Sequence, residues 1–236
     1  MYYDIVIIFF AILLIDKTSI YLHNVKYPEK NVHHNVRWFF IHFFINLFIA
    51  ASTTTDLTYC LNNIEECAYE DISPSSMLAV KSAIVSHLYH CIMFFKDLNH
   101  HDWTHHILMV GITGPIAIYF PTKQTACGLW FMSGFPGMID YFLLWLVKMN
   151  MLDKQIEKTA YKYINTWVRS PGCLLTFCFG LNRLMHPETK NDLYVSLINS
   201  FLAYWNGQYY MMLTCEAYGK NLERNMRKKK EFVLKR

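Results

Sequence analysis

The stretch that decides the fold is QTACGLWFMSGFPGMIDYFLLWLV, residues 124–147, in which Asp140 is the only charged side chain. A helix that crosses the hydrocarbon core of a bilayer needs about 20 mostly apolar residues. Two further stretches are comparably apolar, residues 38–52 (WFFIHFFINLFIAAS) and residues 193–215. Together these stretches predict an all-α, polytopic membrane protein.

Seven segments are candidates for spanning helices, which predicts a bundle of about seven transmembrane helices. The candidates are roughly residues 2–22, 36–55, 76–96, 105–122, 124–147, 171–186 and 193–215. We expect one transmembrane domain over residues 1–219, followed by a basic cytosolic tail over 220–236. Pro115 and Pro136 lie inside the fourth and fifth candidates and predict kinks, because proline removes a backbone hydrogen bond. The sixth candidate is short.

The stretch before the sixth candidate has its own pattern. Residues 154–169 place Ile156, Ala160, Ile164 and Trp167 near helical spacing among several lysines. This pattern is typical of a helix that lies in the membrane interface. The sequence therefore predicts a separate interfacial helix here.

Lysine and arginine are concentrated in alternate connections, and this bias sets the predicted orientation. With seven spans, a lumenal or outside N-terminus and a cytosolic C-terminus, one side receives most of the basic residues: Lys17, Lys26, Lys30, Arg37, Lys96, Lys148, Lys154, Lys158, Lys162, Arg169 and the tail. The other side receives the acidic loop 53–75, the turn 121–123 and the loop 186–190. Lys81 and Arg183 also fall toward that outer side.

Composition limits the classes of partner. Charged residues make up 17% of the chain, whereas soluble domains carry about 25%. The net charge of +4 is concentrated in the tail that begins at Lys220. Beside an apolar span, such a tail favours anionic lipid headgroups on a cytosolic leaflet. We therefore expect membrane lipids, and not nucleic acid, as partners.

The seven cysteines predict no zinc site of the usual kind, because the chain contains no CxxC pair. Most of them fall in apolar segments and are expected to behave as small buried hydrophobic residues. Cys60 and Cys67 share a polar loop and could pair if that loop is lumenal.

Histidines form the densest chemical signal. Six of the eleven lie within twenty residues: His87, His90, His100, His101, His105 and His106. Residues three or four apart on a helix share a face, so His87 and His90 point the same way. The predicted topology places these rings, Asp140, Asn206 and Gln208 in the cytosolic half of the membrane. Spans three, four, five and seven would then line one pocket.

Ionisable groups inside a membrane are expensive and by default suggest function. We expect a pocket with catalytic residues His105, His106 and Asp140, and with substrate-binding residues His87, His90, Asn206 and Gln208. Simpler interpretations remain open. His100 and His101, in a loop, can simply be solvated. The amides and His87 and His90 can serve only as hydrogen bonds between helices.

One family shares part of this pattern. His105-His106-Ile-Leu-Met, followed by Gly137-Met-Ile-Asp140-Tyr141 running into Lys148-Met149, resembles the TLC family of membrane proteins, which includes the ceramide synthases. The resemblance covers about residues 85–150. It matches Asp140 to the second of two family aspartates, while Met138 and Ile139 occupy the region of the first. It implies lipid acyl transfer and, by analogy, the endoplasmic reticulum or another internal membrane.

The resulting hypothesis is acyl transfer from acyl-CoA as co-substrate to a lipid, without a cofactor. His105 or His106 would act as general base or acyl acceptor, and Asp140 would orient the ring. Fatty acid elongases are a second comparison, although the box His101-Asp-Trp-Thr-His105-His106 is one residue longer than theirs. A metal-dependent lipid enzyme with histidine boxes lacks its second and third boxes here, and no metal ligand set is assigned. A non-catalytic lipid sensor or accessory protein is the competing class. Oligomeric state is not encoded.

Overall fold

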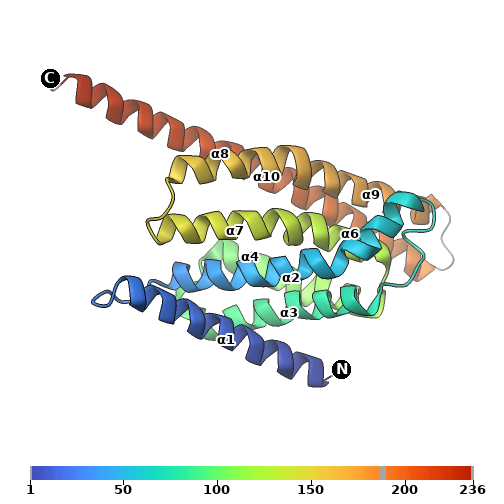
Figure 1. Cartoon of the computed structure of the whole chain (residues 1–236). Coiled ribbons are helices and arrows are strands. Elements are labelled where there is room, and N and C mark those ends of the chain that lie inside the picture. The colour runs from blue at the N-terminus through green and yellow to red at the C-terminus, as the bar shows by residue number, and fades with distance from the viewer. Residues whose placement is uncertain (1, 186–189, 235–236) are drawn as a thin grey trace.

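The chain folds into a bundle of long helices that run back and forth along a common direction (Figure 1). The computed structural model describes residues 2–185 and 190–234, and the predicted loop at 186–190 lies largely outside them. Within the described residues the helices are α1 Tyr2–Lys26, α2 His34–Asn62, α3 Pro74–Met93, α4 His100–Leu108, α5 Gly114–Tyr119, α6 Lys123–Leu129, α7 Phe135–Lys148, α8 Lys154–Ile164, α9 Ser170–Met185 and α10 Lys190–Leu234. A short 3-10 turn, η1 Phe95–Asp97, follows α3.

Three π-helical turns join neighbouring helices into longer ones. They are η2 Met109–Thr113 between α4 and α5, η3 Trp130–Gly134 between α6 and α7, and η4 Asn165–Arg169 between α8 and α9. Each turn is followed by a proline at the second position of the next helix: Pro115, Pro136 and Pro171. Proline clashes with the carbonyl four residues earlier. One wider turn relieves that clash without ending the helix.

The structure corrects two predictions about local structure. Residues 154–169 do not form a separate interfacial helix, because α8, η4 and α9 make one continuous helix from Lys154 to Met185. The π turn η4 accommodates Pro171, so the helix continues past it. His100 and His101 do not lie in a loop. They form the first turn of α4, where Asn99 and Asp102 make a reciprocal capping box.

Three of the described helices are long and apolar enough to cross a membrane: Tyr3–Lys26, His34–Asn62 and Lys123–Lys148. The last two contain the predicted stretches 38–52 and 124–147. The predicted stretch 193–215 lies within α10, which is not among the three. The fold is thus all-helical, as predicted, with three candidate membrane spans.

The loops divide between two ends of the bundle. At the basic end, Lys26 Nζ and Tyr27 Oη donate hydrogen bonds to the Met149 carbonyl, both at 2.8 Å. These bonds join loops 27–33 and 149–153. At the acidic-loop end, the Ile72 amide donates to the Pro121 carbonyl (3.1 Å), which joins loop 63–73 to turn 120–122. The loops grouped by charge in the sequence therefore do share an end.

Helix α2 is the centre of the bundle, since it packs against α1, α3, α6 and α7. The core between these helices includes Ile12, Ile41, Ile49 and Tyr89. Asn46 of α2 accepts a hydrogen bond (2.7 Å) from Ser133 Oγ in η3, just before α7. A Cβ at Gly137 would meet the Asn46 side chain at 2.5 Å. The glycine therefore permits close packing of α2 and α7, the helix that carries Asp140.

The basic tail is a helix. α10 passes through the predicted boundary at residue 219 without a break and reaches Leu234 (Figure 1). Asn221 and Asn225 of α10 donate hydrogen bonds to Gln155 Oε1 of α8, at 2.6 and 3.1 Å. The tail is therefore attached to the start of α8 at the basic end.

Candidate functional site

Five histidine rings from three helices lie together toward the basic end of the bundle. They come from α2, α3 and α4 and form the histidine cluster: His42, His87, His90, His105 and His106. The ring centroid of His87 lies 4.9 Å from that of His105 and 5.1 Å from that of His106. The sequence predicted that these residues of α3 and α4 converge, and they do.

The closest pair in the cluster is His87 and His105, with 2.9 Å between their Nε2 atoms. His87 Nδ1 lies 2.6 Å from the Ala83 carbonyl, which can only accept, so Nδ1 carries a proton. In the neutral ring His87 Nε2 is then the acceptor, and His105 Nε2 is the donor. The lone pair of a neutral His105 ring is consequently on Nδ1. His105 is exposed, whereas His87 is 9% exposed.

Two other rings are fixed in the same way. His42 Nδ1 lies 3.0 Å from the Trp38 carbonyl, and His106 Nδ1 lies 2.5 Å from the Asp102 carbonyl. In the neutral rings both Nε2 atoms carry lone pairs. His106 Nε2 and both ring nitrogens of the fully buried His90 make no hydrogen bond. Buried polar atoms without a hydrogen-bond partner cost free energy and are rare in folded proteins, so these nitrogens are candidate ligand-binding atoms.

An aromatic stack connects the cluster to α7. His42 lies between His90 and Tyr141, with ring centroids at 4.4 and 4.3 Å, and Trp38 stacks on His90 at 4.0 Å. Tyr141 directly follows Asp140. The residue that follows Asp140 in the chain is therefore in contact with the histidine cluster.

Asp140 itself does not contact the twin histidines. The residue is 7% exposed, its Oδ1 atom has no hydrogen-bond partner, and no hydrogen bond joins it to His105 or His106 among the described residues. Backbone carbonyls and His87 orient those rings instead. The expected arrangement, in which Asp140 holds an imidazole, is absent among the described residues, and the charged groups that act most on Asp140 are Glu157 and Lys158 of α8.

Arg169 is the charged group that interacts with both halves of the site. It is 8% exposed and is close enough to interact electrostatically with His105 and with Asp140. Its guanidinium donates hydrogen bonds to Tyr161 Oη and Asn206 Oδ1, both at 3.0 Å. It also lies over the Tyr210 ring, 4.2 Å from the centroid. Its Nε has no partner, and no carboxylate of the described residues forms an ion pair with it.

The two predicted amides separate. Asn206 contributes to the site, because it orients Arg169. Gln208 donates to Ser170 Oγ at 3.0 Å and so fastens α10 to α9. Gln208 is thus a packing residue, which was the simpler interpretation of such amides.

A cavity of about 510 Å³ opens beside these groups. Asp140, Tyr141 and Trp38 line it, together with partners of Arg169 and charged groups nearer the basic end: Tyr161, Tyr210, Lys158, His34, Asp97 and Asp102. This volume is in the range of small-ligand sites. Apolar side chains, among them Leu144 and Leu213, line the cavity together with the polar and charged groups.

Metal binding has a specific geometric requirement. In the described part of the chain, the only three candidate ligand atoms that lie within 4.8 Å of one another are sulfurs, from Cys60, Cys67 and Cys127. The histidine cluster does not bring three ring nitrogens that close together. Its arrangement is that of a hydrogen-bonded pair with neighbours rather than a prearranged ligand set.

Comparisons with protein families, curated proteins and solved structures found no match to this chain. Function is therefore argued from the site itself.

Sequence reasoning missed four groups, of which two left a signal. His42 is the only ionisable residue in the apolar stretch 38–52. Arg169 was counted only among the basic residues that set the orientation, at the end of the predicted interfacial helix 154–169. Trp38 carried no signal, because aromatic residues are common throughout these helices, and Tyr141 entered only as part of the motif of the family resemblance.

Proposed function

We propose that the chain is a seven-span membrane enzyme that transfers an acyl group from acyl-CoA to a lipid acceptor. The observation that carries the proposal is the His87–His105 pair. A buried histidine accepts a hydrogen bond from an exposed one, which leaves the exposed ring with a free lone pair on Nδ1. Imidazole titrates near neutral pH and suits both nucleophilic and general-base roles.

In the proposed reaction, His105 Nδ1 attacks the thioester carbonyl. The carbon–sulfur bond breaks, a carbon–nitrogen bond forms, and the thiolate leaves and takes up a proton. The acceptor's amine or hydroxyl then attacks the acyl-imidazole, loses its proton and regenerates His105. His87 Nε2 accepts the Nε2 proton more strongly as positive charge develops on His105. This is the role that a carboxylate plays in other triads.

Arg169 supports the same step. Buried charges are normally paired, yet the Arg169 guanidinium has neutral partners and lies within electrostatic reach of His105. A cation in this position stabilises an oxyanion or binds a phosphate of the acyl carrier. Lys96 and Lys148 near the basic end would attract the same anionic carrier.

Asp140 is assigned a different part from the one expected. It lines the cavity with Lys158 and Tyr161, and Oδ1 has a free hydrogen-bonding position. We assign it to the lipid acceptor, whose amine or hydroxyl can donate to it. His90 and His106 also have unpartnered ring nitrogens, and we assign them to the substrate beside His105, since they belong to the histidine cluster and do not line this cavity.

The proposed topology has a lumenal or outside N-terminus and a cytosolic C-terminus. The clustering of lysine and arginine at one end supports it, and so does the Cys60–Cys67 disulfide at the other end, since disulfides form in oxidising compartments. The TLC resemblance and an internal membrane such as the endoplasmic reticulum remain part of the proposal. The basic helical tail would contact anionic headgroups.

One observation favours a second candidate, a non-catalytic lipid-binding protein. Asp140 and the twin histidines do not form the acid–base pair that the family resemblance implied. In this alternative the cavity holds a lipid headgroup and the histidines serve only helix packing. A metal-dependent or elongase-like lipid enzyme has less support, because the cluster offers no prearranged ligand set.

The two candidates differ in an activity assay. Membranes that contain the chain are incubated with labelled palmitoyl-CoA, and the lipid products are separated. We expect new labelled lipid from the wild type and from His100→Ala, an exposed residue on the same helix. His105→Ala should abolish it. If wild-type membranes make no more labelled lipid than empty membranes with any acyl chain length tried, the enzyme proposal is wrong.

His87 is a positioning residue, and its test uses a conservative replacement. Gln places an amide oxygen near the position of Nε2 and can still accept from His105, whereas Ala cannot. We expect His87→Gln to retain much more activity than His87→Ala, at equal protein levels. Equal losses in both variants would contradict the proposed hydrogen bond.

A further inference from the structure

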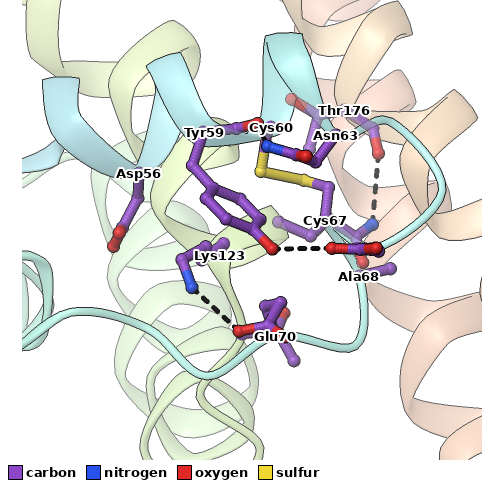
Figure 2. Close-up of a disulfide and its surroundings, with 12 residues drawn as sticks. Asp56, Tyr59, Cys60, Asn63, Cys67, Ala68, Glu70, Lys123 and Thr176 are labelled. Carbon is purple, nitrogen blue, oxygen red and sulfur yellow. Dashed lines mark hydrogen bonds and ion pairs between the residues drawn. A yellow bond between two sulfur atoms is a disulfide. The ribbon is translucent and has the colours of Figure 1, made fainter.

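Three sulfur atoms meet at the acidic-loop end, away from the histidine cluster. Cys60 at the end of α2 forms a disulfide with Cys67 in the following loop (Figure 2). The free thiol of Cys127, on α6, completes the group, and the three sulfurs all lie within 4.8 Å of one another. Each of the three residues is 0% exposed.

Hydrogen bonds fix the cysteine loop against α6 independently of the disulfide. The Gln124 amide donates to the Cys67 carbonyl (3.1 Å), and the Lys123 amide donates to the Glu70 carbonyl (2.9 Å). Lys123 Nζ also pairs with Glu70 at 3.2 Å, as Figure 2 shows. Cys127 lies one turn further along the same helix. Its position beside the disulfide is therefore built into the backbone.

The surroundings exclude soluble thiols. The three cysteines belong to an apolar cluster with Leu57 and Phe179, and Trp130, Phe131 and Leu175 pack against it. A buried disulfide of this kind is protected from external reductants. The reaction partner that is already in place is the thiol of Cys127.

We propose that these three cysteines form an internal thiol–disulfide exchange site. The Cys127 sulfur attacks one sulfur of the Cys60–Cys67 bond, that bond breaks, and a new sulfur–sulfur bond forms to Cys127. The proton of Cys127 passes to the sulfur that is released. One disulfide and one thiol are present before and after, so no oxidant or reductant is consumed.

Exchange changes which elements are covalently joined. The present disulfide joins the end of α2 to the loop that directly follows it. A bond from Cys127 to Cys60 ties α6 to α2, and a bond to Cys67 ties α6 to the loop. Because α6 continues through η3 into α7, either bond fixes the outer end of the helix that carries Asp140 and Tyr141. The exchange does not depend on the proposed acyl transfer.

Linkage mapping in single-cysteine variants tests the site. Cys60→Ala and Cys67→Ala are expressed without added reductant, denatured in N-ethylmaleimide, digested and analysed by mass spectrometry. We expect a Cys67–Cys127 disulfide in the first and a Cys60–Cys127 disulfide in the second. Cys127→Ala should show only the original bond. Cys173, a buried free thiol outside the group, serves as control and should carry the maleimide label throughout.

The result that overturns the proposal is full maleimide labelling of Cys127 in both variants. If neither variant accumulates, the wild-type protein incubated without added thiol and sampled over time gives the same decision. Peptides that link Cys127 to Cys60 or Cys67 should then appear with time. A protein that shows only the Cys60–Cys67 bond and labelled Cys127 at all times has no exchange site.

Discussion

The two ends of the bundle treat their polar groups in opposite ways. At the acidic-loop end, Asp56 accepts two hydrogen bonds from Ser73, at 2.9 Å each, and Lys123 pairs with Glu70. A disulfide closes the loop there. Toward the basic end, Asp140 keeps a buried oxygen without a partner beside a cavity, and His90 and His106 keep buried ring nitrogens without partners in the histidine cluster. The first arrangement is typical of a region that stabilises the fold, and the second is typical of a ligand-binding site.

One network of polar groups toward the basic end is fully hydrogen-bonded. The half-buried Arg37 and the buried Asp16 form an ion pair toward the basic end, with hydrogen bonds of 2.7 and 2.5 Å, and Tyr89 donates to the same carboxylate at 2.6 Å. Tyr89 precedes His90 in the chain. A fully satisfied network thus supports the helix that carries the unsatisfied ring.

The largest expected effect is on stability, from this network. Arg37→Met should destabilise the protein by about 3–5 kcal/mol, because it leaves Asp16, 1% exposed, without its cation. The measurement is the denaturation midpoint in detergent, with Lys220→Met as the control for an exposed pair. A midpoint equal to the control's would show that the pair does not stabilise the fold.

The next effect is on activity alone. His105→Ala should lower acyl transfer by about 10²-fold or more, because it removes the nucleophile that forms the acyl intermediate. Its denaturation midpoint should fall much less than that of Arg37→Met, because the neutral His87 Nε2 loses its donor but no buried charge is left unpaired. Parallel loss of activity and stability would remove the distinction between the satisfied network and the reactive pair.

Removal of the disulfide should have a moderate effect. The bond closes a short loop, so the double variant Cys60→Ala with Cys67→Ala should lose about 2 kcal/mol of stability. Cys67→Ala alone should lose less, because Cys127 can replace the missing partner. The two midpoints, measured without reductant, decide this, and equal midpoints would contradict the replacement.

The smallest expected effect is a pH dependence at the start of α2. Burial and the neighbouring His34 hold the pKa of His33 below its usual 6.5. Its unprotonated Nδ1 accepts from the Asn35 amide at 3.1 Å. A lowered folded-state pKa means that this contribution is present above pH 6.5 and is lost as the pH falls below it. The protection factor of the Asn35 amide, which is its intrinsic exchange rate divided by its observed rate at the same pH, should therefore fall on acidification in the wild type. It should stay constant in His33→Asn.

The sequence predicted the helical class because long apolar stretches leave few alternatives. It also predicted that His87, His90, His105 and His106 converge, since helical spacing and depth determine which faces meet. It could not predict the partner of each ring. Whether Asp140 meets α4 or α8 depends on helix rotation and on the π turn before Ser170, and a hydropathy pattern does not encode either.

The most direct test of the central claim is to locate the acyl group on the enzyme. Purified protein is mixed with labelled palmitoyl-CoA without a lipid acceptor, quenched within seconds and digested for mass spectrometry. The account predicts acylation on the peptide that contains His105, present in the wild type and His100→Ala and absent in His105→Ala. Acylation that is unchanged in His105→Ala, or that maps only to a cysteine, would contradict it.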